Sequence, residues 1–138
     1  GTMARSAVMS RGIFLHPIMF DTSGNPYEHE VGNTYADVGE TALVPYVESG
    51  PVELGGGNNV LSATSLIPDV TSLGDITTTF YTRLYPTDSD TAHGPYTMVA
   101  PTSVRFTGRT CRMKATSASS AAWNLGIPRL EMKPGGKR

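Results

Sequence analysis

Asp88, Asp90 and His93 form the one cluster of side chains in this sequence that could pass for a catalytic or cation-binding loop. An Asp-x-Asp spacing is typical of calcium loops, because alternate carboxylates can reach one ion. The glycine and the bidentate glutamate that complete an EF-hand loop do not follow. We therefore expect no metal ion and no cofactor, and we interpret Asp88, Asp90, His93 and the nearby Tyr96 as candidate contact residues.

The other two histidines do not predict a metal site either. His29 lies between Glu28 and Glu30, and in an extended strand both glutamates point away from the imidazole. Three ligands cannot meet on one side of that segment, so an exposed or edge strand is favoured. His16 precedes Pro17 within an apolar segment, where a hydrogen-bonded structural histidine is the ordinary outcome.

Phosphate binding and nucleophilic catalysis lack their usual motifs. Residues 55–59, Gly-Gly-Gly-Asn-Asn, could cradle a phosphate, but no Gly-Lys-Ser/Thr follows, so we predict a turn between strands. No serine stands in a Gly-x-Ser-x-Gly elbow, and Cys111 lies mid-strand on the apolar side, which predicts a buried inert thiol. We therefore expect no enzyme. A hydrolase is the weakest alternative, and it would need Asp88 or Asp90 to face a distant glutamate.

The formal charge of −1 conceals an asymmetry along the chain. Residues 102–138 hold eight basic side chains against Glu131 alone, whereas residues 1–101 hold three basic and eleven acidic ones. In the favoured interpretation the two parts pair as neighbouring strands and neutralise each other. In the alternative, one face binds an acidic partner or a neighbouring subunit. The basic ending makes Lys137 and Arg138 further candidate contact residues.

Basic residues interleave with apolar ones between Arg105 and Lys114, a pattern that could mark a nucleic-acid surface. Strand alternation divides them, because Arg105 and Arg109 fall on opposite sides of a bulge expected at Gly108. Few aromatic rings are available as a stacking platform. Ion pairs between strands are favoured, and specific nucleic-acid binding is not expected.

The composition predicts a single soluble all-β domain. The chain of 138 residues has the length of one domain, and its 15 glycines and 10 prolines interrupt any long helix. One cysteine permits no intramolecular disulfide, which fits assembly in a cytosol, and no apolar run reaches the roughly 20 residues of a membrane span. Residues 1–3 are interpreted as a vector-derived leader in front of one β domain over residues 4–138.

Alternation and turn residues place the main strands. Strands are predicted over Ile13–Phe20, Tyr27–Val31, Leu43–Val47, Val60–Ile67 and Asp75–Tyr85. The first two should form a hairpin around the turn formers of residues 21–26. The last is the clearest and should cross the middle of a sheet. One of its faces carries Ile76, Thr78, Phe80, Thr82 and Leu84.

The remainder of the chain has a less regular pattern. Residues 86–101 are expected to form a long polar loop that carries contacts. The apolar side of the chain switches across Gly108, which indicates a bulge there. Trp123 alternates with Leu125 and Ile127 and is expected to be buried, and Pro128 indicates a last strand that is bent or at an edge.

Several stretches, taken together and in order, resemble the C-terminal part of tail proteins of tailed bacteriophages. They are Arg11–Phe14, Tyr27–Gly32, Tyr46–Pro51, Ile67–Asp69, Gly94–Tyr96, Val104–Arg109 and Trp123–Leu130. The ending is similar to the last strands of nozzle or packaged-DNA-stabilisation proteins of short-tailed phages. Hub or tip proteins of long-tailed phages have similar endings.

The resemblance implies an antiparallel β-sandwich, or the terminal blades of a β-propeller-like assembly, that acts as a structural component of a phage tail. Its implied partners are other tail proteins and copies of the same chain, without a membrane, in a virion assembled in the host cytoplasm. The alternative is a receptor- or carbohydrate-binding module that contacts a host surface glycan. An exposed Trp123 beside an open groove would favour it, since its ring, with Tyr81, Tyr85 and Tyr96, would offer platforms to a sugar.

Overall fold

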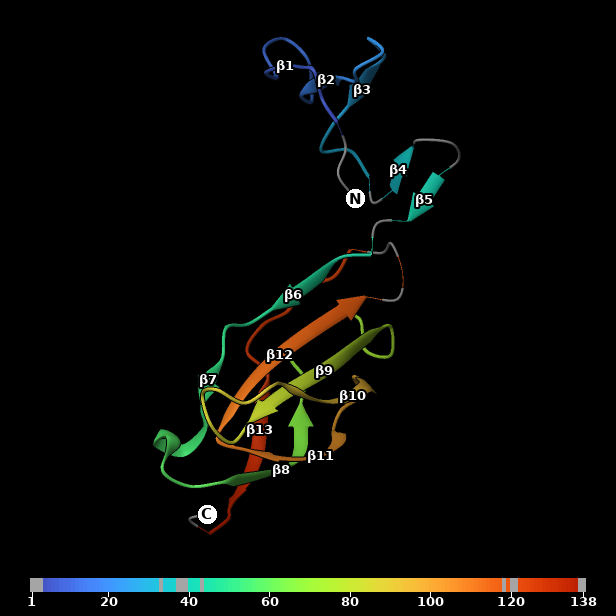
Figure 1. Cartoon of the computed structure of the whole chain (residues 1–138). Helices are drawn as coiled ribbons and strands as arrows, with labels where there is room; N and C mark the ends of the chain where they lie inside the picture. The colour runs from blue at the N-terminus through green and yellow to red at the C-terminus, as the bar shows by residue number, and fades with distance from the viewer. Residues whose placement is uncertain are drawn as a thin grey trace. The chain divides into compact units, whose positions relative to one another are not determined.

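The computed structural model describes residues 4–32, 34–36, 40–42, 44–117, 119 and 122–136. The chain is all-β with antiparallel sheets, which confirms the predicted fold class. It divides into two compact units, Gly1–Thr34 and Tyr35–Arg138 (Figure 1). Compactness does not by itself make a folding domain, so the single β domain over residues 4–138 stays a prediction.

The first unit is a three-stranded antiparallel sheet with the order β1-β2-β3. Its strands are β1 (Ala7–Met9), β2 (Ile18–Phe20) and β3 (Pro26–Glu28). The predicted hairpin is confirmed, since β2 pairs with β3, although both strands are shorter than expected. The carboxylate of Asp21 holds the turn by accepting hydrogen bonds from the backbone N–H groups of Ser23 (2.8 Å) and Asn25 (2.9 Å).

A short pair of strands follows, β4 (Thr34–Ala36) and β5 (Glu40–Ala42). Leu43 lies outside the described residues, and the strand predicted from it begins only at Tyr46. The glycine run lies in a short kinked 3-10 segment, Leu54–Gly57, in which Gly55 and Gly56 have a non-helical backbone with φ of 59° and 74°. The predicted turn between strands is therefore confirmed, and its glycines supply the left-handed backbone that it needs.

Two larger sheets make up most of the second unit. One has the order β10-β9-β12-β6, with β7 also beside β12, and the other has the order β11-β8-β13. The strands of the first are β6 (Tyr46–Glu48), β7 (Val52–Glu53), β9 (Ile76–Arg83), β10 (Thr91–Thr97) and β12 (Thr110–Ser117). The strands of the second are β8 (Leu61–Ile67), β11 (Thr102–Gly108) and β13 (Arg129–Pro134).

The two larger sheets pack through the side chains that β9 and β11 turn inward, which gives a sandwich-like arrangement. Four side chains of β9 are buried: Ile76, Thr78, Phe80 and Thr82. Phe80 stacks on Phe106 of β11, with ring centroids 4.7 Å apart. The predicted central position of β9 is confirmed, since it lies between β10 and β12, but the strand ends at Arg83 and Leu84 is exposed.

The prediction of a bulge at Gly108 is wrong. β11 ends at Gly108 in one sheet and β12 begins at Thr110 in the other, so the chain crosses between the sheets here. The apolar side chains of β11 and those of β12 both point into the space between the two sheets, so they lie on opposite sides of the chain before and after the crossing. A Cβ atom on residue 108 would lie 2.8 Å from Cβ of Thr82, and this close approach requires glycine.

The long polar loop predicted over residues 86–101 is wrong in its middle. Thr91–Thr97 forms β10, which pairs with β9 at an edge of its sheet. The register shifts between His93 and Tyr96, and most of the strand is exposed and polar. The alternation that marks a half-buried strand is therefore missing from the sequence.

The C-terminal segment departs in part from its predicted alternation. Trp123 and Leu125 are half-buried against the core, but Ile127 is 78 % exposed. Asp69 accepts hydrogen bonds on its side chain from the N–H of Ile127 (2.9 Å) and on its carbonyl from the N–H of Gly126 (2.7 Å). Polar anchoring to this upstream residue turns Ile127 away from the core. The last strand, β13, lies at an edge as predicted.

Replacing Phe80 by alanine tests the assignment of the core. The substitution should lower the free energy of unfolding by about 3–5 kcal/mol, because it removes buried apolar area and leaves a cavity. Urea denaturation measures the effect. Leu84→Ala, just beyond the same strand, is the matched control and should change stability by less than about 1 kcal/mol. An unchanged midpoint for Phe80→Ala would contradict the inward orientation of this face.

Candidate functional site

The structure places the predicted contact residues in three different surroundings. Asp88 and His93 line an open polar pocket, Asp90 belongs to a network of ion pairs, and Tyr96 is half-buried against the core. Two further candidates lie outside the described residues: Lys137 and Arg138. The cluster in the sequence is therefore not one site in space.

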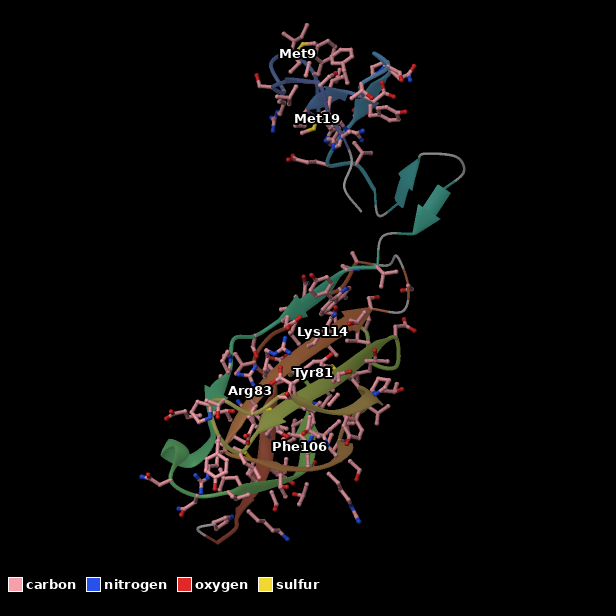
Figure 2. All side chains as sticks on the ribbon, viewed as in Figure 1. Met9, Met19, Tyr81, Arg83, Phe106 and Lys114 are labelled. Atoms are coloured by element: carbon pink, nitrogen blue, oxygen red, sulfur yellow. The ribbon has the colours of Figure 1, made fainter. Side chains whose placement is uncertain are left out.

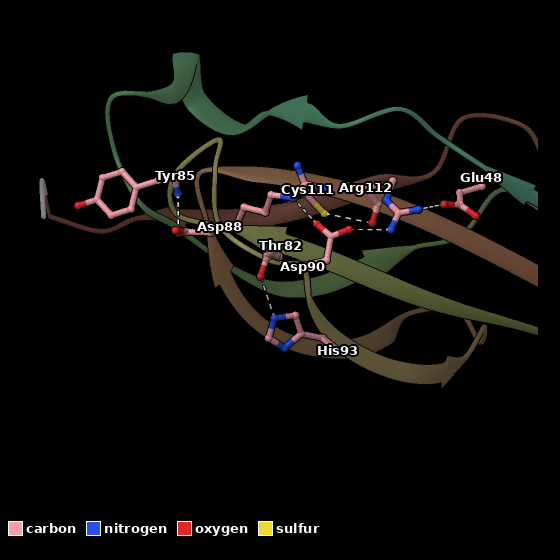
Figure 3. A network of polar contacts seen from close by, with 9 residues as sticks. Glu48, Thr82, Tyr85, Asp88, Asp90, His93, Cys111 and Arg112 are labelled. Atoms are coloured by element: carbon pink, nitrogen blue, oxygen red, sulfur yellow. Dashed lines mark hydrogen bonds and ion pairs between the residues drawn. The ribbon is translucent and has the colours of Figure 1, made fainter.

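An open pocket of about 480 Å³ lies where the connection between β9 and β10 meets β11. It is rich in hydroxyl groups and is lined by Thr82, Arg83, Leu84, Asp88, Ser89, Thr91, His93 and Thr107. Thr82 Oγ1 and His93 Nε2 share a hydrogen bond of 2.9 Å (Figure 3), and the imidazole stacks on Phe106 with ring centroids 5.5 Å apart. Contacts with the core therefore fix the orientation of His93.

Asp88 shapes the pocket as a turn residue. Its carboxylate accepts a hydrogen bond from the N–H of Tyr85 (2.9 Å), and its own N–H donates to the carbonyl of Tyr85 (3.0 Å). These two bonds close the connection that follows β9, which explains an aspartate at this position. A carboxylate, an imidazole and several hydroxyls in one open pocket can bind a small polar ligand through hydrogen bonds.

Asp90 connects strands of the five-stranded sheet on its outer face. Its carboxylate accepts hydrogen bonds from Nε of Arg83 and from Nη2 of Arg112 (2.8 Å), and Arg112 forms a second ion pair with Glu48 (Figure 3). The hydrogen bond from Arg83, together with its positive charge, lowers the pKa of Asp90 below the usual 3.8. Arg112 comes from the basic part of the sequence and both carboxylates from the acidic part, so mutual neutralisation is confirmed for these residues.

Tyrosine rings cover Arg112 and two other basic side chains of this region. The pairs are Arg109 with Tyr85 (5.2 Å), Arg112 with Tyr81 (4.4 Å) and Lys114 with Tyr46 (4.4 Å). Figure 2 shows Tyr81, Arg83 and Lys114 on the five-stranded sheet. Sequence reasoning missed these cation–π pairs, because they depend on how β6, β9 and β12 align. These arginine and lysine side chains contact carboxylates or tyrosine rings of the same sheet, which favours the ion-pair interpretation over a nucleic-acid surface.

An apolar groove opens between the two sheets, beside β7 and β13. Its volume is about 340 Å³, and its walls are Ser49, Val52, Leu54, Leu66, Phe80, Cys111, Met113, Pro128, Leu130 and Met132. Leu66 and Phe80 are fully buried, whereas Val52 and Met132 are 58 % and 39 % exposed. Burial raises the pKa of the Cys111 thiol to about 11, so Cys111 is the buried neutral thiol that was predicted.

The first unit has no buried side chain among residues 4–32. It presents three consecutive large apolar residues, Ile13, Phe14 and Leu15, which are 97 %, 45 % and 75 % exposed. Polar contacts join its ends instead, such as the hydrogen bond from Arg5 Nε to His29 Nε2 (3.1 Å). A sheet this small has too little core for independent stability, so its apolar side chains need a covering surface.

Comparison with models of known protein families and with curated proteins finds no match. Among the described residues, no group of three or more His, Cys, Asp or Glu side chains could hold a metal ion. The same part of the chain has no helix that is long and apolar enough to cross a membrane.

Acid sensitivity should report the Asp90 network. The pKa of Asp90 is lower in the folded chain than in the unfolded one, so the unfolded chain binds more protons below about pH 4. The free energy of unfolding should therefore decrease as the pH is lowered. Asp90→Asn should remove part of this slope in urea denaturation across roughly pH 2–5. Asp21, whose pKa is also lowered, should still contribute to the acid slope of the Asp90→Asn chain.

Arg83→Met provides the control for this prediction. It removes the main cause of the lowered pKa, so adding Asp90→Asn to an Arg83→Met chain should change the acid slope little. An Asp90→Asn chain with the slope of the parent would show that the network does not contribute to folding stability.

Proposed function

We propose that the chain is a structural component of a bacteriophage tail that acts through contacts with neighbouring subunits. The observation that carries the proposal is the first unit, which exposes Ile13, Phe14 and Leu15 and has no buried side chain among residues 4–32. Such a unit gains stability by burying these side chains on another surface, as subunits of an assembly do. The resemblance of several stretches to tail proteins supports this kind of assembly.

Two features of the second unit also support a structural role. The bases of its outer sheet face contact carboxylates and tyrosines of the same face, so they brace the sheet. Cys111, the one thiol of the chain, is buried with a pKa raised to about 11, far from the thiolate that nucleophilic catalysis needs. We therefore assign no reaction to the chain and attribute its function to its surfaces.

The proposed partners are other tail proteins and further copies of the chain, in a virion assembled in the host cytoplasm. Within the tail it would occupy the position of the nozzle or packaged-DNA-stabilisation proteins, or that of the hub or tip proteins. The test is quantitative mass spectrometry of purified tails of the phage whose genome carries the coding sequence. A fixed copy number in the tails is expected, and absence from the tails would overturn the proposal.

The basic ending is expected to be a contact element. Exchanging Lys137 and Arg138 for glutamate should reduce incorporation into particles roughly tenfold, because two reversed charges repel an acidic partner surface. The melting temperature of the isolated chain should stay nearly constant. Arg105→Glu, at an exposed base of β11, is the control for charge reversal elsewhere. If the variant is incorporated as well as the parent chain, Lys137 and Arg138 are not part of the contact surface.

The polar pocket favours a second candidate, a receptor- or carbohydrate-binding module of the tail. It gathers His93, Asp88 and the hydroxyls of four neighbouring residues, which are the groups that hydrogen-bond sugar hydroxyls. The aromatic platform expected from Trp123 does not support this candidate, because Trp123 is half-buried against the core.

A glycan array followed by calorimetry tests the second candidate. If a glycan binds in the pocket, His93→Ala should weaken its affinity by about tenfold, the value of one hydrogen bond of roughly 1–1.5 kcal/mol. Lys133→Ala on β13 lies outside the pocket lining and should leave the affinity unchanged. Glycan binding that is insensitive to His93→Ala would show that the pocket is not the binding site.

A further inference from the structure

The polar pocket beside the β9–β10 connection holds several hydrogen-bonding groups that the chain itself does not use. In the part of the chain that the structure describes, three lining residues have side-chain hydroxyls without a hydrogen bond: Ser89, Thr91 and Thr107. Nδ1 of His93 and Oδ1 of Asp88 have none either, since the bonds of these side chains use Nε2 and Oδ2. The pocket of about 480 Å³ has the size of a small-molecule site and presents five polar groups to a ligand.

The lining of the pocket also carries one negative charge that no ion pair balances. Its one base belongs to a set of two guanidinium groups and two carboxylates whose charges cancel: Arg83, Arg112, Asp90 and Glu48. Asp88 forms no ion pair with any described residue, and its carboxylate accepts a hydrogen bond only from the backbone N–H of Tyr85 (2.9 Å; Figure 3). A ligand that enters the pocket therefore meets a carboxylate with a free oxygen, which favours a positive charge on the ligand.

A protonated amine matches this combination of groups. An ammonium group donates three hydrogen bonds and accepts none, and carboxylate and hydroxyl oxygens are its acceptors. A hydrogen bond between an ammonium and a carboxylate is about twice as strong as one between neutral groups. Among the described residues, no group of three or more His, Cys, Asp or Glu side chains could hold a metal ion. The cation that suits the pocket is therefore an organic one.

The hydroxyl groups of the lining favour a sugar over the side chain of a lysine. Of the described residues that line the pocket, Leu84 alone is apolar, so the aliphatic stem of a lysine would find few contacts. The hydroxyls of a sugar ring both donate and accept hydrogen bonds, and so do those of serine and threonine. The ligand that uses the whole lining combines an ammonium group with several hydroxyls.

We propose that the polar pocket binds an amino sugar whose amino group is free and protonated, with the ammonium at Asp88. The inference rests on the second candidate function, the glycan-binding module, and names its ligand class. N-acetylation of the sugar removes the positive charge and one or more donors at the same position. The pocket therefore distinguishes an amino sugar from its N-acetylated form.

Calorimetry on the full chain tests this preference with a matched pair of ligands, a glucosamine trisaccharide and its fully N-acetylated counterpart. The free amine should bind at least about tenfold more tightly, the value of one hydrogen bond between charged groups. At a pH high enough to leave the sugar amines uncharged, the preference should disappear. Equal affinity for the two ligands at neutral pH would overturn the inference. So would an amide of Nα-acetyl-lysine that binds as tightly as the free-amine trisaccharide.

Asp88→Asn is the variant that tests the position of the ammonium. The asparagine side-chain oxygen can still accept the hydrogen bond from Tyr85, so the turn is retained while the charge is removed. Affinity for the free amine should fall at least about tenfold, with little change for the N-acetylated ligand. Asp75→Asn, at an exposed carboxylate outside the lining, is the matched control and should bind as the parent does.

Thr107→Val provides a second variant that does not involve the turn. It removes one lining hydroxyl at an exposed position of β11 and should weaken binding of the free amine severalfold. Melting temperatures near that of the parent would show that both variants are folded. An Asp88→Asn chain that is folded and keeps the preference for the free amine would overturn the inference.

These outcomes separate the inference from the functions proposed above. Binding of both trisaccharides with equal affinity, lost in His93→Ala, would overturn the amino-sugar preference and leave a glycan pocket in place. Binding of no glycan would overturn the preference and the second candidate function together. The tail role is tested independently, by the presence of the chain in purified tails.

Discussion

The stacking of Phe80 on Phe106 is the contact on which the second unit depends. It joins the two larger sheets through rings 4.7 Å apart, and because side chains alternate along a strand, turning Phe80 inward turns Tyr81 outward. Strand register carries this choice to the neighbours. His93 lies opposite Phe80 and shares its face, whereas Arg112 lies opposite Tyr81. One apolar contact therefore decides which polar groups reach the pocket and which reach the outer face.

The charged side chains on the outer face of the five-stranded sheet have contact partners within the chain, whereas part of the apolar surface has none within its own unit. On the outer face, Arg112 contacts Asp90, Glu48 and a tyrosine ring, so little is gained there by a further partner. The groove and the Ile13–Leu15 segment have no such cover within their units. Subunit binding is therefore expected at the apolar features, and the charged side chains mainly hold the sheet that forms one wall of the groove.

Much of the fold followed from local patterns in the sequence. The hairpin around Asp21, the turn at Gly55 and Gly56, and the two faces of β9 depend on residues that are near one another in the chain. At Gly108 the sequence pattern locates the change of the apolar side correctly but predicts the wrong cause, because such a change has two possible causes. A bulge and a crossing between sheets leave the same local alternation, and they differ only in the distant strand that forms the hydrogen bonds.

For the candidate site, the sequence by itself determined the residue types, and tertiary structure decided which of them meet. Asp88, Asp90 and His93 were recognisable as polar groups near one another, yet Asp90 points to Arg112 while His93 contacts Thr82. The cation–π pairs and the groove were not predictable, because they require the register of strands far apart in sequence and the spacing of two sheets. Alternation is a local property of the chain, whereas pairing is decided by the free energy of packing the whole unit.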